Sequence, residues 1–239
     1  MHPEKIPIER CVPQQSRLDI GRDVIKGVAL LTMTVDHVGA ILYPEYVGLR
    51  IIGRLAFPLF AYLLVLGVKS TRNVNNYLFR LGVFALISQI PFSLALGILP
   101  WQRLNIYFTL TAGVLALKWF TQKSELIVLP FLVATVLNFD YNFYGMFTII
   151  FLQILYTNTK KGVLALLGLN VIVSQIMPTQ VYSLLALPLI LLHKIVSENP
   201  PRDTILQTPY PTWRKYSFYM YYPLHLTLLY LFSCRVLAV

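Results

Sequence analysis

Long apolar segments, separated by short polar connections, make up most of this chain. The segments are continuous rather than alternating, so they predict helices and not the strands of a membrane barrel. A helix needs roughly 20 residues to cross a bilayer, where it satisfies its own backbone hydrogen bonds. We predict an all-α polytopic transmembrane helical bundle with about nine spans, the pattern allowing eight to ten. The predicted spans are residues 24–43, 51–68, 77–98, 104–120, 125–138, 141–157, 162–177, 179–193 and 216–236.

Composition supports an integral membrane protein. Of the 239 residues, 56% are hydrophobic and 13% are charged, and the mean hydropathy is +0.64. Soluble domains carry about 25% charged residues, so this composition excludes a soluble protein. Residues 1–22 are polar and contain Pro3, Pro7 and Pro13, which discourage a helix. We therefore expect a cytoplasmic tail at residues 1–22 and a single transmembrane domain at residues 23–239.

Lysine and arginine are distributed unevenly between the two sides of the predicted bundle. When the spans alternate in direction, sixteen of the 20 Lys and Arg residues fall on one side and four on the other. The first set is Lys5, Arg10, Arg17, Arg22, Lys26, Lys69, Arg72, Arg80, Lys118, Lys123, Lys160, Lys161, Lys194, Arg202, Arg214 and Lys215; the second is Arg50, Arg54, Arg103 and Arg235. Because cytoplasmic loops carry the excess of Lys and Arg, the N-terminus is predicted to be cytoplasmic and the C-terminus external. The formal charge of +10 therefore reflects topology, and we expect no nucleic-acid partner.

Asp36 and His37 interrupt the first apolar segment beyond its midpoint. An Asp near the centre of a transmembrane helix costs roughly 2.5–3.5 kcal/mol on insertion scales. Two interpretations account for the pair: polar side chains that join two helices, or side chains kept for function, which we favour. His37 follows Lys26 by eleven residues, so both share one helix face about 16 Å apart, with His37 toward the external side. Asp36 points about 100° away and is expected to pair with a basic or hydroxyl group on another helix.

Other polar residues are predicted at the same external depth. Arg54 lies one helical turn after Arg50 at the start of the second span, Asn105 and Tyr144 lie near the starts of the fourth and sixth, and His225 lies within the ninth. Taken singly, each is typical of an interface anchor or a helix end. Their coincidence at one depth indicates a site in the external half of the bundle.

His37 fits the chemistry of a general base. A neutral imidazole in a low-dielectric site takes a proton from an amine or hydroxyl nucleophile. Asp36 would support it by orienting or tuning the site. The candidates for placing a substrate or stabilising an oxyanion are Arg54, Asn105, Tyr144 and His225. No His or Cys pair has the i, i+4 spacing of a metal site, so no metal is expected.

Five cations on the predicted cytoplasmic side are candidates for binding an anionic, phosphate-bearing donor. They are Lys26, Arg22, Arg72, Lys69 and Arg80. The alternative is that they only determine the topology, as Lys and Arg beside membrane spans commonly do.

Several blocks of sequence resemble the TraX family of membrane acetyltransferases. They are Arg22-Asp23-Val24-Ile25-Lys26 through Asp36-His37, Gly53-Arg54-Leu55-Ala56-Phe57-Pro58-Leu59-Phe60, Leu104-Asn105-Ile106-Tyr107-Phe108-Thr109, Tyr144-Gly145 and Tyr222-Pro223-Leu224-His225-Leu226. The chain also looks like a relative of the broader transmembrane acyltransferase group, which includes the acyltransferase-three proteins. In that group a basic residue, ten positions and a catalytic histidine recur in one helix, and Lys26 and His37 fit this spacing.

The resemblance implies an acetyl-CoA-dependent N- or O-acetyltransferase, multi-pass in the bacterial inner or plasma membrane. Acetyl-CoA would bind from the cytoplasm as the acyl donor. The acceptor at the external side would be the N-terminus of a pilin, or an amine or hydroxyl of a sugar or lipid. The expected partners are thus membrane lipids, an acyl-CoA and a protein, glycan or lipid acceptor, and an oligomer is compatible with the sequence.

Two other functions remain open from the residues alone. The same intramembrane ionisable side chains could form the path of an ion or small-solute transporter or channel. Paired broken helices in two halves of the chain would favour that function, and the sequence has no convincing pair. A structural or assembly partner in the membrane would instead keep its function after substitution of Asp36 and His37.

Overall fold

The computed structural model describes residues 19–198 and 212–237. Within these ranges every regular element is a helix, which confirms the all-α fold class. The elements are α1 (Ile20–Ile41), α2 (Val47–Gly53), α3 (Ala56–Ser70), α4 (Val74–Leu96), α5 (Ile106–Thr121), η2 (Glu125–Ile127), α6 (Val128–Val136), α7 (Asn142–Thr157), α8 (Thr159–Ser174), η3 (Pro178–Ala186), α9 (Leu187–Glu198) and α10 (Thr212–Leu237). Most of the predicted tail, residues 1–18, lies outside the described residues.

Each predicted span coincides with one helical segment, counting α2 with α3, η2 with α6, and η3 with α9. Among the described residues, four segments are long and apolar enough to cross a membrane: Ile20–Ile41, Val47–Ser70, Val74–Leu96 and Pro178–Glu198. Three shorter apolar segments, Ile106–Thr121, Glu125–Val136 and Asn142–Thr157, fall below that length. The chain is thus a membrane protein, while the number of crossings and the cytoplasmic N-terminus stay predictions.

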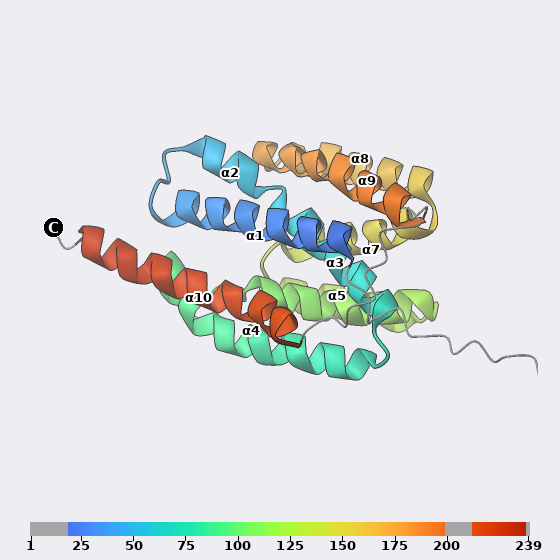
Figure 1. Cartoon of the computed structure of the whole chain (residues 1–239), viewed down its shortest axis with the longest axis horizontal. Helices are drawn as coiled ribbons and strands as arrows, with labels where there is room; N and C mark the ends of the chain where they lie inside the picture. Colours follow the sequence, from blue (N-terminus) through green and yellow to red (C-terminus); the bar gives the residue numbers. More distant parts are fainter. Residues whose placement is uncertain (1–18, 199–211, 238–239) are drawn as a thin grey trace, which may run out of the picture.

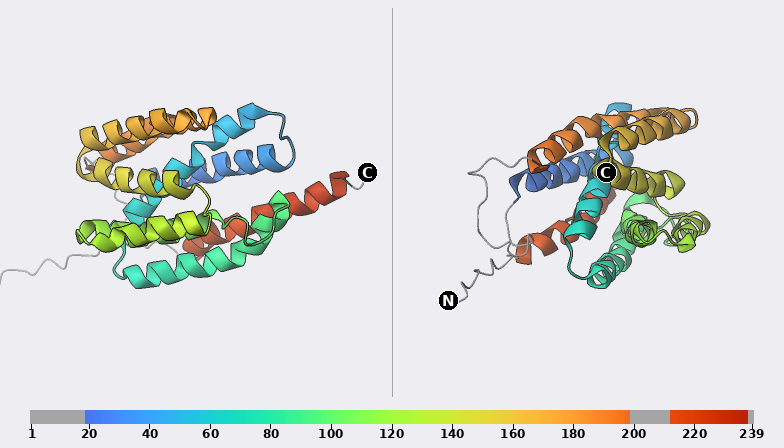
Figure 2. Two further views of the ribbon diagram at one scale, coloured as in Figure 1. Left: turned by 180° about the vertical axis from the view of Figure 1, so that it is seen from behind. Right: turned by 90° about the vertical axis from the view of Figure 1, so that its right-hand side faces the viewer.

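Most helices run roughly along the long axis of the molecule (Figures 1 and 2). In Figure 1, α1, α2, α8 and α9 lie along one side and α4 and α10 along the other. Helix α3 crosses obliquely between them and contacts α1, α5, α7 and η3. Nine of its 15 residues are buried, so α3 is the central element on which the rest of the bundle packs.

The second predicted span is broken, which the sequence analysis did not anticipate. Helix α2 ends at Gly53 and α3 begins at Ala56, with Arg54 and Leu55 in a turn between them. Pro58 explains the break, because it has no N–H to bond the carbonyl of Arg54 and its ring crowds that carbonyl. The connection at residues 42–46 turns α2 back along α1, and the break lets α3 take a different direction from α2.

Two glycines allow α1 and α2 to approach closely. A Cβ atom at Gly53 would lie 2.1 Å from Oδ1 of Asp36, and one at Gly39 would lie 2.7 Å from Cβ of Leu49. Both distances are far below van der Waals contact, so neither position accepts a larger residue without a shift of the helices. This contact brings the cations of α2 beside Asp36.

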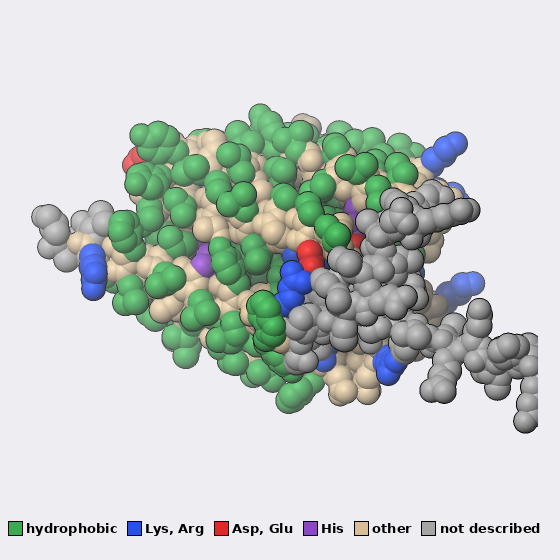
Figure 3. Space-filling model, viewed as in Figure 1, with side chains coloured by type: hydrophobic (Ala, Val, Ile, Leu, Met, Phe, Trp, Pro, Cys, Tyr) green, Lys and Arg blue, Asp and Glu red, His purple; other side chains and the backbone are tan. Residues whose placement is uncertain are grey.

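Charged side chains are segregated on the surface. In the view of Figure 3, hydrophobic side chains cover the middle of the bundle, and most Lys and Arg side chains lie toward the right-hand end, away from the C-terminus. The exposed apolar side chains include Leu31, Leu86, Leu164 and Leu228, which are 65–72% exposed. A band of this kind is what a lipid-facing surface requires.

Candidate functional site

Asp36 forms an ion pair between α1 and α2. Nη1 of Arg50 donates to Oδ2 of Asp36 at 2.7 Å and to the Asp36 carbonyl at 3.0 Å. Nη2 of Arg54 lies 4.0 Å from Oδ1 of Asp36. Arg50 is thus the basic partner from another helix that the sequence led us to expect. Oδ1 itself is buried and has no hydrogen bond among the described residues.

His37 contacts His225 of α10 across the interface between the first and last helices. Nδ1 of His37 lies 2.9 Å from Nε2 of His225, and Nδ1 of His225 lies 2.9 Å from the Tyr221 carbonyl oxygen. The sequence placed both histidines at one depth, and the structure brings their rings into contact.

The Tyr221 carbonyl determines where the protons of two neutral rings lie. A carbonyl oxygen only accepts, so Nδ1 of His225 carries the proton and its Nε2 is an acceptor. Nδ1 of His37 must then donate to it, which leaves the lone pair on Nε2 of His37. No other hydrogen bond of the His37 ring is present within residues 19–198 and 212–237. The arrangement presents a basic nitrogen with a fixed tautomer.

Further contacts hold α10 against α1 and α5 at this level. The hydroxyls of Thr34 and Tyr221 are 2.7 Å apart, and the Tyr221 ring stacks on His225 with centroids 5.2 Å apart. Pro223 has no N–H for the Tyr219 carbonyl one turn earlier, and the Tyr107 hydroxyl of α5 donates to that carbonyl at 2.9 Å. The proline in α10 is therefore accommodated by a tertiary hydrogen bond beside the histidine pair.

Asp36 and His37 line one cavity of about 40 Å³. The other lining residues are Met33, Ala56, Phe57, Phe60, Ile106, Asp140, Tyr141 and Tyr222. None of these was predicted from the sequence as a catalytic or binding residue. Tyr222 carried a usable signal, because it lies three residues before His225 and so on the same face of the helix.

Arg54 and Asn105 lie near this cavity without lining it. Arg54 is buried, and its Nη1 donates to Oε1 of Gln180 at 3.2 Å. The Asn105 amide donates to Oε1 of Gln89 and the Ala85 carbonyl, both at 2.8 Å, and its oxygen caps α5 at the Tyr107 N–H. Every polar atom of the Asn105 side chain thus has a protein partner, and its contact with a substrate stays a prediction.

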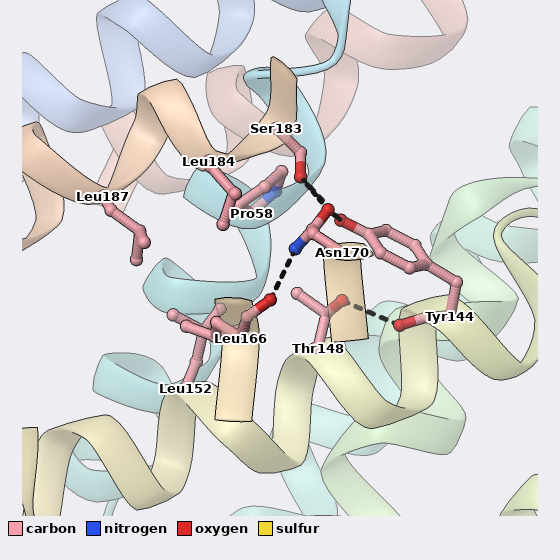
Figure 4. A pocket seen from close by; sticks show the side chains of 9 residues that line it. All are labelled: Pro58, Tyr144, Thr148, Leu152, Leu166, Asn170, Ser183, Leu184 and Leu187. Carbon is pink, nitrogen blue, oxygen red and sulfur yellow. Dashed lines mark hydrogen bonds between the residues drawn. The ribbon is translucent and has the colours of Figure 1, made fainter. Parts of the chain in front are cut away.

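Tyr144 belongs to a second, smaller cavity between α7, α8 and η3 (Figure 4). Its hydroxyl lies 2.8 Å from the Ser183 hydroxyl and 3.3 Å from Oδ1 of Asn170, and Ser183 also donates to Asn170 at 2.8 Å. This cavity has a volume of about 10 Å³, and His37 is not among its lining residues. Tyr144 thus lines a different cavity from His37, although its ring centre lies 6.2 Å from those of Phe57 and Tyr141, which line the His37 cavity. Its role toward a substrate stays a prediction.

The cations proposed for a donor lie at the ends of α1, α3 and α4. Arg22 donates to the Ser70 hydroxyl at 3.3 Å, Lys26 pairs with Asp23 at 2.9 Å, and Arg72 is exposed in the loop between α3 and α4. Nζ of Lys69 lies 4.3 Å from the Tyr156 ring centre, and the Arg80 guanidinium lies 5.6 Å from that of Tyr77. The bond from Arg22 to Ser70 joins the start of α1 to the end of α3 at this end of the bundle.

A separate titratable cluster lies at the start of α1. The Asp19 carboxylate caps the helix by accepting from the Arg22 N–H at 2.9 Å, and its Oδ2 lies 3.6 Å from Nε2 of His193. The His193 side chain lowers the pKa of Asp19 to about 2. Nδ1 of His193 lies 3.0 Å from the buried Tyr62 hydroxyl, so the cluster connects α1, α3 and α9.

Comparison with known proteins places the chain in a family. The family described as TraX protein matches residues 21–233. The chain belongs to the TraX family. The acyltransferase-three relation stays a resemblance, and no solved structure matches.

Two relatives illustrate how far the similarity extends. A probable fimbrial assembly protein FimC (serogroup H1) of Dichelobacter nodosus is 28% identical over 247 residues, covering 89% of this chain and 95% of that protein. Protein TraX of Escherichia coli is 36% identical over 106 residues, covering 43% of this chain and 41% of that protein. The alignment with the Escherichia coli protein thus spans less than half of either chain.

Proposed function

We propose that this TraX family member is an acetyltransferase that moves an acetyl group from acetyl-CoA to an amine or hydroxyl acceptor. His37 acts as its general base. The observation that carries the proposal is the hydrogen-bond chain from Tyr221 through His225 to His37 at the wall of a cavity. It ends on a ring nitrogen that has a lone pair and no protein partner among the described residues.

In the proposed reaction, Nε2 of His37 takes the proton of the acceptor N–H or O–H as the acceptor attacks the thioester carbonyl carbon. When the C–S bond breaks, the same proton passes to the departing thiolate, so that CoA leaves as a thiol. His37 is an imidazolium only between these steps. Its Nδ1–H bond to His225 is then charge-assisted and stronger, which supports formation of the imidazolium.

The charges around Asp36 support acyl transfer in the same place. Arg50 and Arg54 together outnumber the one carboxylate that they flank. Asp140 lines the same cavity as a second carboxylate, so the support comes from the closeness of two guanidinium groups, and not from an excess of positive charge, to the place where a tetrahedral intermediate develops a negative oxygen. Asp36 has the role of holding both cations rather than of orienting His37, with which it has no hydrogen bond within the described ranges.

The donor would bind at the cationic end of the bundle. Acetyl-CoA carries phosphate groups, and the best-placed cations are Arg22, Lys26, Lys69, Arg72 and Arg80. Its pantetheine arm would extend along α1, on which Lys26 and His37 share one face. We expect no metal in this reaction. The protein would act as a multi-pass protein of the bacterial inner membrane, as a monomer or an oligomer.

The names of the relatives favour an acceptor in pilus or fimbrial assembly. One relative is a probable fimbrial assembly protein, and it aligns over most of this chain. The proposed acceptor is therefore the N-terminal amine of a pilin subunit, with a sugar or lipid as the alternative. Analysis of envelope components by mass spectrometry, with and without this protein, would identify the acetylated molecule.

The experiment that tests the function uses inside-out membrane vesicles, so that the cytoplasmic face is outside. Acetyl-CoA with a labelled acetyl group is added outside, and a synthetic peptide with a free α-amine or a hexosamine is enclosed inside. We expect the label on one enclosed acceptor, and its loss in His37→Ala. The control is Thr32→Val, which changes a buried polar side chain on the same helix but outside the cavity. Equal labelling in vesicles without the protein would contradict the proposal.

A further inference from the structure

One hydroxyl in the wall of the His37 cavity has no acceptor for its proton. Tyr222 lines the cavity and is 3% exposed, and its oxygen has no hydrogen bond among the described residues. The backbone group that faces this oxygen is the N–H of Ile106, which can only donate. The proton of the Tyr222 hydroxyl is therefore left without an acceptor in the described protein. Such a buried group is rare, and a ligand oxygen in the cavity would satisfy it.

Three neighbouring rings hold Tyr222 in place. Its ring lies nearly perpendicular to that of Tyr107, with the centroids 5.3 Å apart. The ring centroids of His37 and His225 lie 5.9 and 5.6 Å from that of Tyr222. Side chains of α1, α5 and α10 thus fix the Tyr222 ring, so the hydroxyl need not reorganise before it binds a ligand.

The other polar side chains of the cavity are less suited to bind a negative oxygen. Asp36 and Asp140 are carboxylates, which repel a negative oxygen when they are ionised. The Tyr141 ring stacks on Phe57 with centroids 4.2 Å apart, and among the described residues it has no ring contact with the histidine pair. Tyr222 is thus the neutral donor in the wall whose ring contacts the proposed general base.

The size of the cavity fits the reacting group of the donor. Its volume is about 40 Å³. A water-sized group needs roughly 10–15 Å³ measured in this way, so the cavity takes about three such groups. An acetyl group has a methyl group, a carbonyl carbon and a carbonyl oxygen. The cavity can therefore receive the acetyl group while the rest of acetyl-CoA stays outside it.

We propose that the Tyr222 hydroxyl is the hydrogen-bond donor that stabilises the oxyanion of the acyl transfer. The inference rests on the proposed function and adds a catalytic residue to it. As the acceptor attacks, the C=O electron pair moves onto the thioester oxygen, which accepts a hydrogen bond from Tyr222. When the C=O bond re-forms, the C–S bond breaks and the thiolate takes the proton that His37 removed from the acceptor. Tyr222 keeps its own proton, so atoms and charge balance without a further reactant.

This assignment changes the role of Arg54, which was one of the sequence candidates for the oxyanion. The Arg54 guanidinium donates to Gln180 at 3.2 Å, and neither Arg54 nor Arg50 lines the cavity. The two cations act through space, and Tyr222 supplies the direct hydrogen bond. A donor that is already oriented stabilises the developing charge without reorganisation.

The test is Tyr222→Phe, which removes only the hydroxyl. Loss of one oxyanion donor lowers kcat by about 100-fold or more. The interaction forms only in the transition state, so we expect the KM for acetyl-CoA to stay within about twofold of the native value. The melting temperature should not fall, because the hydroxyl proton has no partner in the folded protein.

The matched control is Tyr62→Phe, the same chemical change at another buried tyrosine. Its hydroxyl lies 3.0 Å from Nδ1 of His193, and Tyr62 does not line the cavity. We expect a lower melting temperature and an unchanged kcat for this variant. A second variant carries 3-fluorotyrosine at position 222, which keeps both the ring and the donor. It should keep kcat near the native value.

The readout is thiol release from acetyl-CoA with the peptide or hexosamine acceptor. If Tyr222→Phe keeps kcat within about twofold beside an inactive His37→Ala, water alone satisfies the hydroxyl. That result would overturn the oxyanion donor and leave the proposed function intact. A loss of kcat in the 3-fluorotyrosine variant or in Tyr62→Phe equal to that in Tyr222→Phe would assign the effect to packing and also overturn the donor. An unsubstituted protein that turns over no acetyl-CoA with any acceptor would overturn both.

Discussion

Nδ1 of His37 on α1 lies 2.9 Å from Nε2 of His225 on α10. The two residues are 188 positions apart, so the contact depends on the packing of the first helix against the last. Because Tyr221 fixes the tautomer of His225, His225 in turn fixes the tautomer of His37. The basic nitrogen of the site is therefore determined by a residue that does not line the cavity.

Substitution of His225 tests this dependence. His225→Leu removes the acceptor for the Nδ1–H of His37, and we expect kcat to fall by about 100-fold, at the lower end of general-base effects, because His37 itself remains. His225→Gln offers an amide oxygen at a similar distance and should restore part of the loss. Acetyl-CoA turnover across pH 5.5–9 separates the two, because the Leu variant should also shift the pH profile. If the Gln variant recovers nothing and both variants have the same kcat, His225 has only a packing role.

Gly53→Ala tests the close approach of α1 and α2. The new Cβ would lie 2.1 Å from Oδ1 of Asp36, so the helices must separate, at a cost of about 1–3 kcal/mol. We expect a lower melting temperature and lower turnover, because the shift disturbs the ion pair of Asp36 and Arg50. Gly48→Ala in the same helix is the control, since no atom lies within 4 Å of its added Cβ. Identical melting temperatures for the two variants would contradict the packing described here.

A double-mutant cycle tests the ion pair itself. Asp36→Asn leaves Arg50 and the buried Arg54 without their carboxylate, and we expect clear destabilisation, less than the 3–5 kcal/mol of a fully buried pair because Arg50 is partly exposed. Asp36→Asn with Arg50→Gln should recover part of the loss. The free energies of unfolding of the native protein, Asp36→Asn, Arg50→Gln and the double variant, measured in detergent, give the coupling free energy of the two side chains. Additive effects would show that the 2.7 Å contact contributes nothing to stability.

The cap of α1 predicts a dependence of stability on pH. The pKa of Asp19 is lowered to about 2, so the folded protein binds its proton less readily than the unfolded chain does. The stabilisation of the folded protein by the ionised Asp19 is therefore complete above the ordinary carboxyl pKa near 3.8 and is lost as the pH falls toward 2. We expect Asp19→Asn, which keeps the cap acceptor, to be less stable than the native protein at pH 7 and nearly equal to it at pH 2 and below. A constant difference across this range would contradict the assignment.

Arg22→Gln tests the donor site. Loss of a phosphate partner should raise the KM for acetyl-CoA several-fold and leave kcat unchanged, and added salt should reduce the difference. Lys160→Gln at the start of α8 removes another cation predicted on the same side and should change neither constant. Equal effects of both substitutions would indicate a general electrostatic attraction instead of a binding site.

The sequence predicted the helices and the depth of the histidine pair for physical reasons. Continuous apolar runs identify helices because the period and length are explicit in the chain. Depth follows from counting 1.5 Å per residue, and this placed His37 and His225 at one level. Depth does not say which side of the bundle a residue faces. For that reason Asn105 and Tyr144 were grouped with the histidines, although one caps α5 and the other lines a different cavity.

Two features of the site required the tertiary structure. The break at Arg54 lies inside an apolar run, and Pro58 alone does not distinguish a kink from two separate helices. The tautomer of His37 depends on a carbonyl of α10 that no sequence pattern connects to α1. Both features arise where helices distant in the sequence meet, and both determine which atoms reach the cavity.

The most direct test of the account is acetyl-CoA turnover by the purified protein in a lipid nanodisc, compared between the native chain and His37→Ala. We predict thiol release from the native protein with a free-amine acceptor. The variant should show none, with an unchanged melting temperature and an unchanged thermal shift on adding CoA. Turnover retained in His37→Ala at the native rate would contradict the central claim that this histidine is the general base.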